Sequence, residues 1–265
     1  MSRLLLQPTV ETLEAYCAFA VEHDLGFEVV DFAFPDLLDG GARATVDRYR
    51  ATLADESRLV SIHGPFLDLY VNSPDAAIRR VAKERITQTL AIADELQLEF
   101  VVFHTNCLPM MGRDAYYQRW VDAHVDLWRE VTALHDITVV LENMWDKSPE
   151  LIARVLDGVD SPRLKVCLDT GHHHLFSRES LERWFSCLGE NIAYLHLTDN
   201  MGDFDSELVL GTGVVRWREM TALVDRYCDR PVAVIETAGL EGIRASLSFL
   251  RREHVYPFDV GEPGA

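Results

Sequence analysis

The sequence predicts an α/β fold of the (β/α)8 barrel class in a single domain. Eight short runs rich in Val, Ile, Leu and Phe recur along the chain, and most are followed by a segment with helical spacing. Strands that alternate with helices of this length pair in parallel through crossover connections. Eight units in 265 residues average about 33 residues each, the size expected of such a barrel.

The predicted elements follow one another in regular order. The expected strands are Arg3–Gln7, Phe27–Phe32, Leu59–His63, Phe100–His104, Thr138–Asn143, Leu164–Asp169, Ala193–Thr198 and Val232–Glu236. Apolar stripes at helical spacing lie between them, one through Ile78, Val81, Ala82, Ile86, Leu90, Ala93 and Leu96, another through Trp120, Val121, His124, Leu127, Trp128, Val131 and Leu134. Ser73-Pro74 and Ser148-Pro149 indicate helix starts, with a hydroxyl at the N-cap and proline at the first helical position.

A doubly wound sheet is the rival fold. It would normally show a glycine-rich turn after an early strand, but no G-x-G-x-x-G follows any of the runs, and Gly211-Thr212-Gly213 comes late in the chain. No linker, low-complexity tract or repeat divides the sequence. We therefore expect one domain over residues 1–265, with a frayed end after Pro257.

Composition excludes several classes of function. The 43 acidic residues outnumber the 25 basic ones, which gives a net charge of −18 at pH 7, whereas proteins that bind nucleic acid need a basic face. We read no export signal at the N-terminus and no apolar stretch near the roughly 18 residues of a membrane span. Five cysteines without a C-x-x-C pair suit reduced thiols. These features predict a soluble cytoplasmic protein with no nucleic-acid or membrane partner.

Potential metal ligands stand at the ends of six consecutive expected strands. They are His63, His104, Glu142, Asp169, His196 and Glu236. Catalytic groups of a (β/α)8 barrel lie at the carboxyl ends of its strands, so these six side chains are expected at one rim. His173 and His174 are expected to be structural. Lys165, four residues before Asp169, is expected toward the opposite end of the barrel.

The predicted cluster of carboxylates calls for a cation. Glu142, Asp169 and Glu236 would converge in a cleft of low dielectric, where like charges cannot all stay ionised without a compensating ion. Three carboxylates and one imidazole suit Mn²⁺, Mg²⁺ or Co²⁺, whereas the addition of His63 and His104 favours Zn²⁺. We expect one divalent ion, with room for a second.

The order of these motifs resembles the xylose-isomerase-like TIM-barrel superfamily. The resemblance runs from about residue 25 to 240, and its most specific pieces are Asp169-Thr-Gly-His172 and the stretch from His196 to Gly213. It implies that Glu142, Asp169, His196 and Glu236 bind one metal, that the two glutamates shuttle a proton, and that His172 binds a substrate oxygen.

The endonuclease IV-like members of the same superfamily imply more ligands. The resemblance adds His63, His104, His172 and an Asp-x-His pair, which here reads Asp205-Ser206-Glu207. The replacement of that last histidine by Glu207 departs from the three-metal pattern, although a glutamate can still bind a metal.

The sequence thus predicts a divalent-metal-dependent isomerase or epimerase that acts on a small sugar or polyol-derived ketone through an enediolate. Two alternatives stay open, an endonuclease IV-like multi-zinc phosphoesterase and an inosose- or dehydroshikimate-type dehydratase. A free sugar is favoured over a phosphorylated one, and family analogy favours a homo-oligomer. Six residues are expected to line the pocket, namely Phe66, Tyr70, Asn106, Trp145, Phe176 and Phe204.

Overall fold

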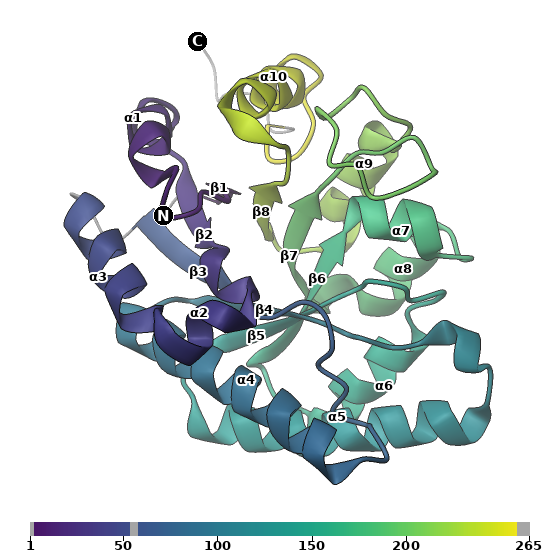
Figure 1. The fold of residues 1–265 in the computed structure, drawn as a ribbon. Coiled ribbons are helices and arrows are strands. Elements are labelled where there is room, and N and C mark those ends of the chain that lie inside the picture. The colour runs from purple at the N-terminus through teal and green to yellow at the C-terminus, as the bar shows by residue number, and fades with distance from the viewer. Residues whose placement is uncertain (1–2, 54–57, 259–265) are drawn as a thin grey trace.

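The computed structural model describes residues 3–53 and 58–258. Its eight strands pair in parallel, each with the next in the chain and the last with the first, to form a closed barrel (Figure 1). They are β1 (Leu4–Leu6), β2 (Gly26–Val29), β3 (Leu59–His63), β4 (Phe100–His104), β5 (Thr138–Glu142), β6 (Leu164–Asp169), β7 (Ile192–Leu197) and β8 (Val232–Ile235). The (β/α)8 TIM-barrel prediction is confirmed.

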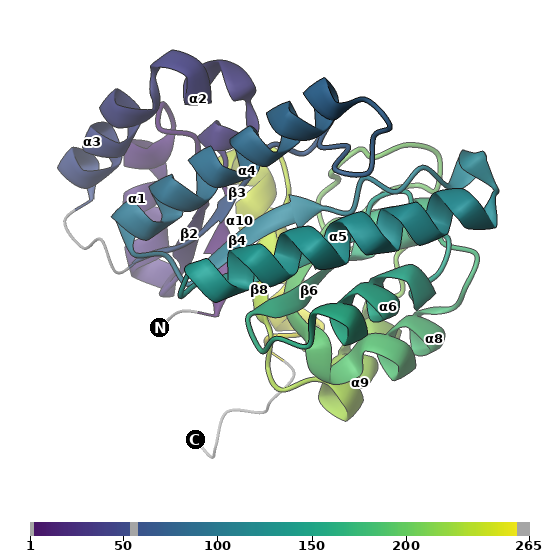
Figure 2. The same ribbon diagram turned by 90° about the horizontal axis from the view of Figure 1, so that it is seen from below.

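Helices surround the strands (Figure 2). They are α1 (Leu13–His23), α2 (Pro35–Gly40), α3 (Ala42–Thr52), α4 (Ala76–Leu96), α5 (Asp114–Leu134), α6 (Glu150–Val159), α7 (Thr170–Phe176), α8 (Leu181–Leu188), α9 (Trp217–Tyr227) and α10 (Gly239–Arg252). Within the described residues, no helix is both long and apolar enough to span a membrane.

The barrel has two separate apolar cores. The larger one lies between the strands and the helices and includes side chains such as Phe103, Trp128 and Trp184. The smaller one is made of strand residues alone and therefore fills the barrel interior. Its buried members are Leu5, Val60, Val102, Val140, Cys167, Tyr194, Val232 and Val234.

A polar layer lies directly above the interior core. Side chains two residues apart on a strand point to the same face. On β3, Ile62 follows Val60 but packs in the outer core; on β1 and on β4 to β8, the residues that follow the last interior apolar residue by two positions face inward. They are Gln7, His104, Glu142, Asp169, His196 and Glu236. Strand register places His104 beside Glu142 and Asp169 beside His196. The parallel pairing itself thus brings the candidate site residues together.

Three details of the sequence prediction are wrong. The second expected strand ends at Val29, because Val30 turns the chain into a 3₁₀ helix, η1 (Asp31–Ala33). The N-caps of α4 and α6 are Asp75 and Pro149, and Asp75 accepts the Ala77 N–H at 2.7 Å.

The predicted apolar stripes also include three residues that are exposed to solvent in the structure. Ile78, Val81 and Leu134 are 43%, 46% and 72% exposed. Ile78 and Leu134 lie in the end turns of α4 and α5, whereas Val81 points outward from the turn in which Ala82 is buried. The expected frayed end lies, from residue 259 onward, outside the described residues.

One buried carboxylate, that of Asp199, fastens the long loop between β7 and α9. It accepts hydrogen bonds from four backbone N–H groups, those of Asn200, Gly211, Gly213 and Val215, and from the Trp217 indole, at 2.8–3.2 Å. Gly213 is required here, because an added Cβ would lie 2.2 Å from Asp199 Oδ1. The loop carries Asp205 and Glu207, so Asp199 determines where these two acids lie.

We predict that Asp199→Ala lowers the free energy of unfolding by about 3 kcal/mol, since several buried donors lose their acceptor. Amide exchange in residues 200–216 should rise, as measured by mass spectrometry. Asp203→Ala is the control, because the exposed carboxylate of Asp203 caps a single loop N–H, that of Phe204. Equal exchange in the two variants would contradict the role given to Asp199.

Candidate metal and active site

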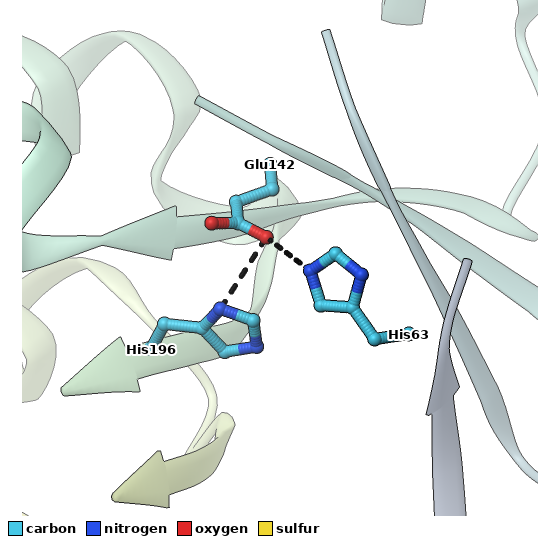
Figure 3. A group of neighbouring side chains, drawn as sticks. All are labelled: His63, Glu142 and His196. Carbon is cyan, nitrogen blue, oxygen red and sulfur yellow. Dashed lines mark hydrogen bonds and ion pairs between the residues drawn. The ribbon is translucent and has the colours of Figure 1, made fainter. Parts of the chain in front are cut away.

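Glu142, at the end of β5, is the centre of the site, and its carboxylate is 1% exposed. Four imidazoles surround it: His63 and His104 with Nε2 at 3.2 Å from Oε2, His172 with Nδ1 at 3.2 Å from Oε1, and His196 with Nδ1 at 3.3 Å from Oε2. Figure 3 shows the carboxylate between His63 and His196. Because an unpaired buried carboxylate is strongly destabilising, these four rings fix the position of Glu142.

His196, on β7, lies between carboxylates on both sides of its ring. Its Nδ1 is 3.1 Å from Glu236 Oε1 as well as 3.3 Å from Glu142 Oε2, and its Nε2 is 3.3 Å from Glu28 Oε1. Neither ring nitrogen makes a hydrogen bond of good geometry to any described residue, although both are fully buried. Buried polar groups are almost always hydrogen-bonded, so Nδ1, which faces both Glu142 and Glu236, is arranged for a different partner.

Asp169 ends β6 and starts α7. Its carboxylate accepts a hydrogen bond from the backbone N–H of His172. It also accepts one from the Thr198 hydroxyl, which lies 2.9 Å from Oδ1 and 2.8 Å from Oδ2. The His172 ring is thereby held at the rim, where its Nε2 lies 3.0 Å from Asp205 Oδ2. Asp205 and Glu207 thus come to the site from the loop that Asp199 fastens.

Sequence reasoning missed two residues of the site, Gln7 and Glu28. Gln7 follows β1, and its amide nitrogen donates to Glu28 Oε1 at 2.7 Å and to Glu236 Oε1 at 2.6 Å. Glu28 lies on β2 and is completely buried. A signal for each was present, since Gln7 ends an expected strand and Glu28 is a charged residue within an apolar run.

The protein's own charges shift the pKa values of the two central glutamates in opposite directions. Burial favours a higher pKa for Glu142, but the charges on His104 and His196 hold it well below its ordinary value. Burial raises the pKa of Glu236 well above its ordinary value, and the charges of Asp169 and Glu142 add to this against the effect of His196. Beside the same imidazole, the carboxyl group of Glu236 therefore holds its proton to a higher pH than that of Glu142.

The two histidines nearest to these acids retain protons. Burial opposes the charged form of His196, yet neighbouring acidic groups, among them Glu236 and Glu142, raise its pKa well above the usual value. For His172 burial is likewise outweighed, mainly by Asp169 and Asp205. The site therefore holds protons that a cation would have to displace.

The residues present fit a divalent cation. Ligand atoms that share an ion at roughly 2.1 Å lie about 3.0–3.5 Å from one another, which is the spacing found around His196 and Glu142. Three groups bring their ligand atoms within 4.8 Å, namely His63–Glu142–His196, Glu28–His196–Glu236 and Glu142–Asp169–His172. Nitrogen and oxygen donors of this kind suit Zn²⁺, Mn²⁺ or Co²⁺.

A cavity of about 270 Å³ opens above these ligands. Eight of its lining residues are polar and five are apolar. The lining residues are Gln7, Val30, Ala33, Phe34, His63, Phe66, His104, Glu142, Met144, His172, Asp205, Glu207 and Glu236. Within the described residues this lining contains no lysine or arginine.

Among the six expected pocket residues, Phe66 does line the cavity. Tyr70, Asn106, Trp145, Phe176 and Phe204 are absent from its described lining, and Phe204 is 65% exposed. Phe34 and Met144, which sequence reasoning overlooked, take part in their stead.

The remaining polar residues of interest lie away from the cavity. His173 packs edge-on against Trp184, and Lys165 donates to Asn191 at 3.1 Å.

Comparison with known proteins agrees with this fold. The family model described as xylose isomerase-like TIM barrel matches residues 19–253. The uncharacterized protein MJ1311 of Methanocaldococcus jannaschii is 26% identical over 185 residues, which are 65% of this chain and 62% of that protein. The chain thus spans less than two thirds of the length of this curated relative.

Solved structures cover almost the whole chain. TTHB071 protein from Thermus thermophilus, from a ZnCl₂ soak, is 27% identical over 94% of this chain and 97% of its own, with a TM-score of 0.75. A D-tagatose 3-epimerase-like protein is 23% identical, with coverages of 93% and 96% and a TM-score of 0.71. D-allulose 3-epimerase from Methylomonas sp., in complex with D-allulose, is 16% identical, with coverages of 95% and 98% and a TM-score of 0.71. The last two likenesses concern the fold alone.

We predict that cation affinity rises with pH through neutrality, because a metal ligand must lose its proton before it binds the cation. The raised pKa values of His172, His196 and Glu236 mean that lower pH keeps these ligands protonated. Calorimetric titration with Zn²⁺ in two buffers of different ionisation enthalpy measures affinity and proton release together. Affinity independent of pH, with no proton released, would contradict this assignment of ligands.

Proposed function

The chain belongs to the xylose isomerase-like TIM barrel family, and on this premise we propose that it is a divalent-metal-dependent isomerase or epimerase of a small sugar or polyol-derived ketone. The observation that carries the proposal is the placement of Glu142 and Glu236 within 3.3 Å of His196 Nδ1, below one cavity. Two carboxyl groups beside one imidazole nitrogen supply the pair of groups that a proton transfer of this kind needs.

Glu142, Asp169, His196 and Glu236 are the residues that would hold the cation. His196 Nδ1, which makes no hydrogen bond to the described residues, and the spacing of the surrounding oxygens support this set. When bound, the cation would polarise the substrate carbonyl and favour the loss of a proton from the adjacent carbon. His63 and His104 extend the donor set around Glu142 and leave room for a second ion.

Proton transfer would be the work of the two glutamates. Glu142 keeps its carboxylate ionised and is suited to remove a proton from the carbon next to the carbonyl, which gives an enediolate. Glu236, whose carboxyl group lies 3.1 Å from His196 Nδ1, would return a proton to the other carbon or to the other face. His172 lines the cavity beside Asp205 and would orient a substrate oxygen.

The cavity favours a small uncharged substrate. Its volume of about 270 Å³ is close to the lower end of the roughly 300–1,000 Å³ found for ligand pockets. Asp205, Glu207 and Glu236 line it, without a cationic side chain among its described residues. Such a lining would repel a phosphate group, so we favour a free sugar over a sugar phosphate. The rings of Phe34 and Phe66 pack edge to face, with their centroids 6.0 Å apart. They offer an apolar surface to the carbon–hydrogen face of a sugar.

We predict that Glu142→Gln and Glu236→Gln each reduce turnover by at least about 10²-fold, because each removes a group that moves a proton. Incorporation of deuterium from D₂O at the carbon next to the carbonyl of ketohexoses reads this step directly. Glu241→Gln, on the exposed side of α10, is the control and should retain the wild-type rate. A Glu142→Gln variant with near wild-type deuterium incorporation would contradict the proton-transfer role given to Glu142.

Hydrolysis of a phosphoester is a second candidate, which the approach of His63 and His104 to Glu142 favours. The net charge of −18 opposes a nucleic acid as substrate. Metal content distinguishes the two reactions, with one ion per chain expected for the isomerase and two or three zinc ions for the phosphoesterase. A product lighter than its substrate by one water would instead identify a dehydratase.

A further inference from the structure

We propose that Glu28 is a positioning residue which, together with Gln7, holds His196 and Glu236 in the orientation that binds the cation. The proposal rests on the function proposed above, since it concerns the ligands of the same ion. It assigns a role to a charged residue in the middle of a buried strand, where an apolar side chain would pack at lower cost.

Four neighbouring groups fix the Glu28 carboxylate. Oε1 accepts the Gln7 amide at 2.7 Å and lies 3.3 Å from His196 Nε2. Oε2 accepts the Tyr194 hydroxyl at 2.7 Å and the Ser61 hydroxyl at 3.3 Å. These groups come from the residue after β1, from β3 and from β7, so the carboxylate cannot turn without loss of several interactions at once.

The first consequence concerns the ring of His196. Its two nitrogens face different carboxylates, Nε2 toward Glu28 and Nδ1 toward Glu142 and Glu236. A carboxylate beside one ring nitrogen of a metal-binding histidine keeps the proton on that nitrogen and leaves the lone pair of the other for the metal. Glu28 therefore presents Nδ1 to the cation.

The second consequence concerns Glu236. The side-chain amide nitrogen of Gln7 donates to Glu28 at 2.7 Å and to Glu236 at 2.6 Å. The charge of Glu28 keeps the NH₂ group of the amide, and not its oxygen, directed into the site. Because this NH₂ group stands between Glu28 and Glu236, Glu28 acts through Gln7 and His196 and does not itself need to bind the ion.

Glu28→Gln tests the proposal, because it keeps the size of the side chain and removes its charge. We expect the variant to bind Co²⁺ about 10- to 100-fold more weakly than the wild type, the usual effect of removing such a partner. The visible absorption of bound Co²⁺ should also change, since this spectrum reports the ligand field and not the overall fold. Gln7→Ala is a second variant, with a loss of affinity in the same direction.

Asp31→Asn is the matched control. Asp31 directly follows the β2 region, and its carboxylate also accepts a tyrosine hydroxyl, that of Tyr49 at 2.6 Å, and a backbone N–H, that of Val10 at 2.9 Å. Its loss should lower the midpoint of thermal unfolding without changing Co²⁺ affinity or absorption. Thermal unfolding without added metal establishes that each variant is folded.

The outcomes separate the two proposals. Weaker Co²⁺ binding and an altered spectrum in Glu28→Gln and Gln7→Ala, but not in Asp31→Asn, support the role of Glu28. Unchanged binding and spectrum in both site variants overturn that role and leave the proposed function standing. A wild-type protein that binds no Co²⁺ overturns both proposals.

Discussion

The site depends on a single constraint, the burial of the Glu142 carboxylate inside the barrel. A buried carboxylate is tolerated only where positive or hydrogen-bonding groups surround it, and four histidines from four different elements supply these groups. Two of these histidines then come close to further acids. Asp169 and Asp205 lie beside His172, and Glu28 and Glu236 lie beside His196. The alternation of imidazole and carboxylate leads from the barrel interior to the cavity mouth.

The barrel builds this arrangement through strand periodicity. Interior apolar residues such as Val140 and Cys167 fill the lower layer, and the residues two positions further, Glu142 and Asp169, form the polar layer above it. Parallel register brings each polar residue next to that of the adjacent strand. The loop after β7 adds Asp205 and Glu207. The fully buried carboxylate of Asp199 holds this loop in place because it accepts hydrogen bonds from backbone N–H groups of the loop. Fold stability and site geometry thus depend on the same strands.

Much of this could be predicted from the sequence, and the remainder has a physical explanation. Strand number and the residues at strand ends follow from the periodicity of apolar runs, so the rim residues from His63 to Glu236 were predictable. For Glu28 the sequence holds only a partial signal, a charge inside an apolar run, because its orientation is set by the neighbouring Tyr194 and Gln7 in the folded protein. The same holds for the pocket wall, where Phe34 lines the cavity and Phe204 faces outward. Loop conformation, which periodicity does not determine, decides between two such aromatic residues.

The central claim is that one divalent cation is shared by Glu142 and His196 Nδ1, with Glu236 and Asp169 as its further ligands. Anomalous X-ray diffraction from crystals grown with Mn²⁺ tests this claim most directly, because the signal locates the metal itself. We predict a single strong anomalous peak within about 2.0–2.3 Å of a carboxylate oxygen of Glu142 and of His196 Nδ1. A peak elsewhere on the protein, or well-ordered crystals with no peak among these residues, would contradict it.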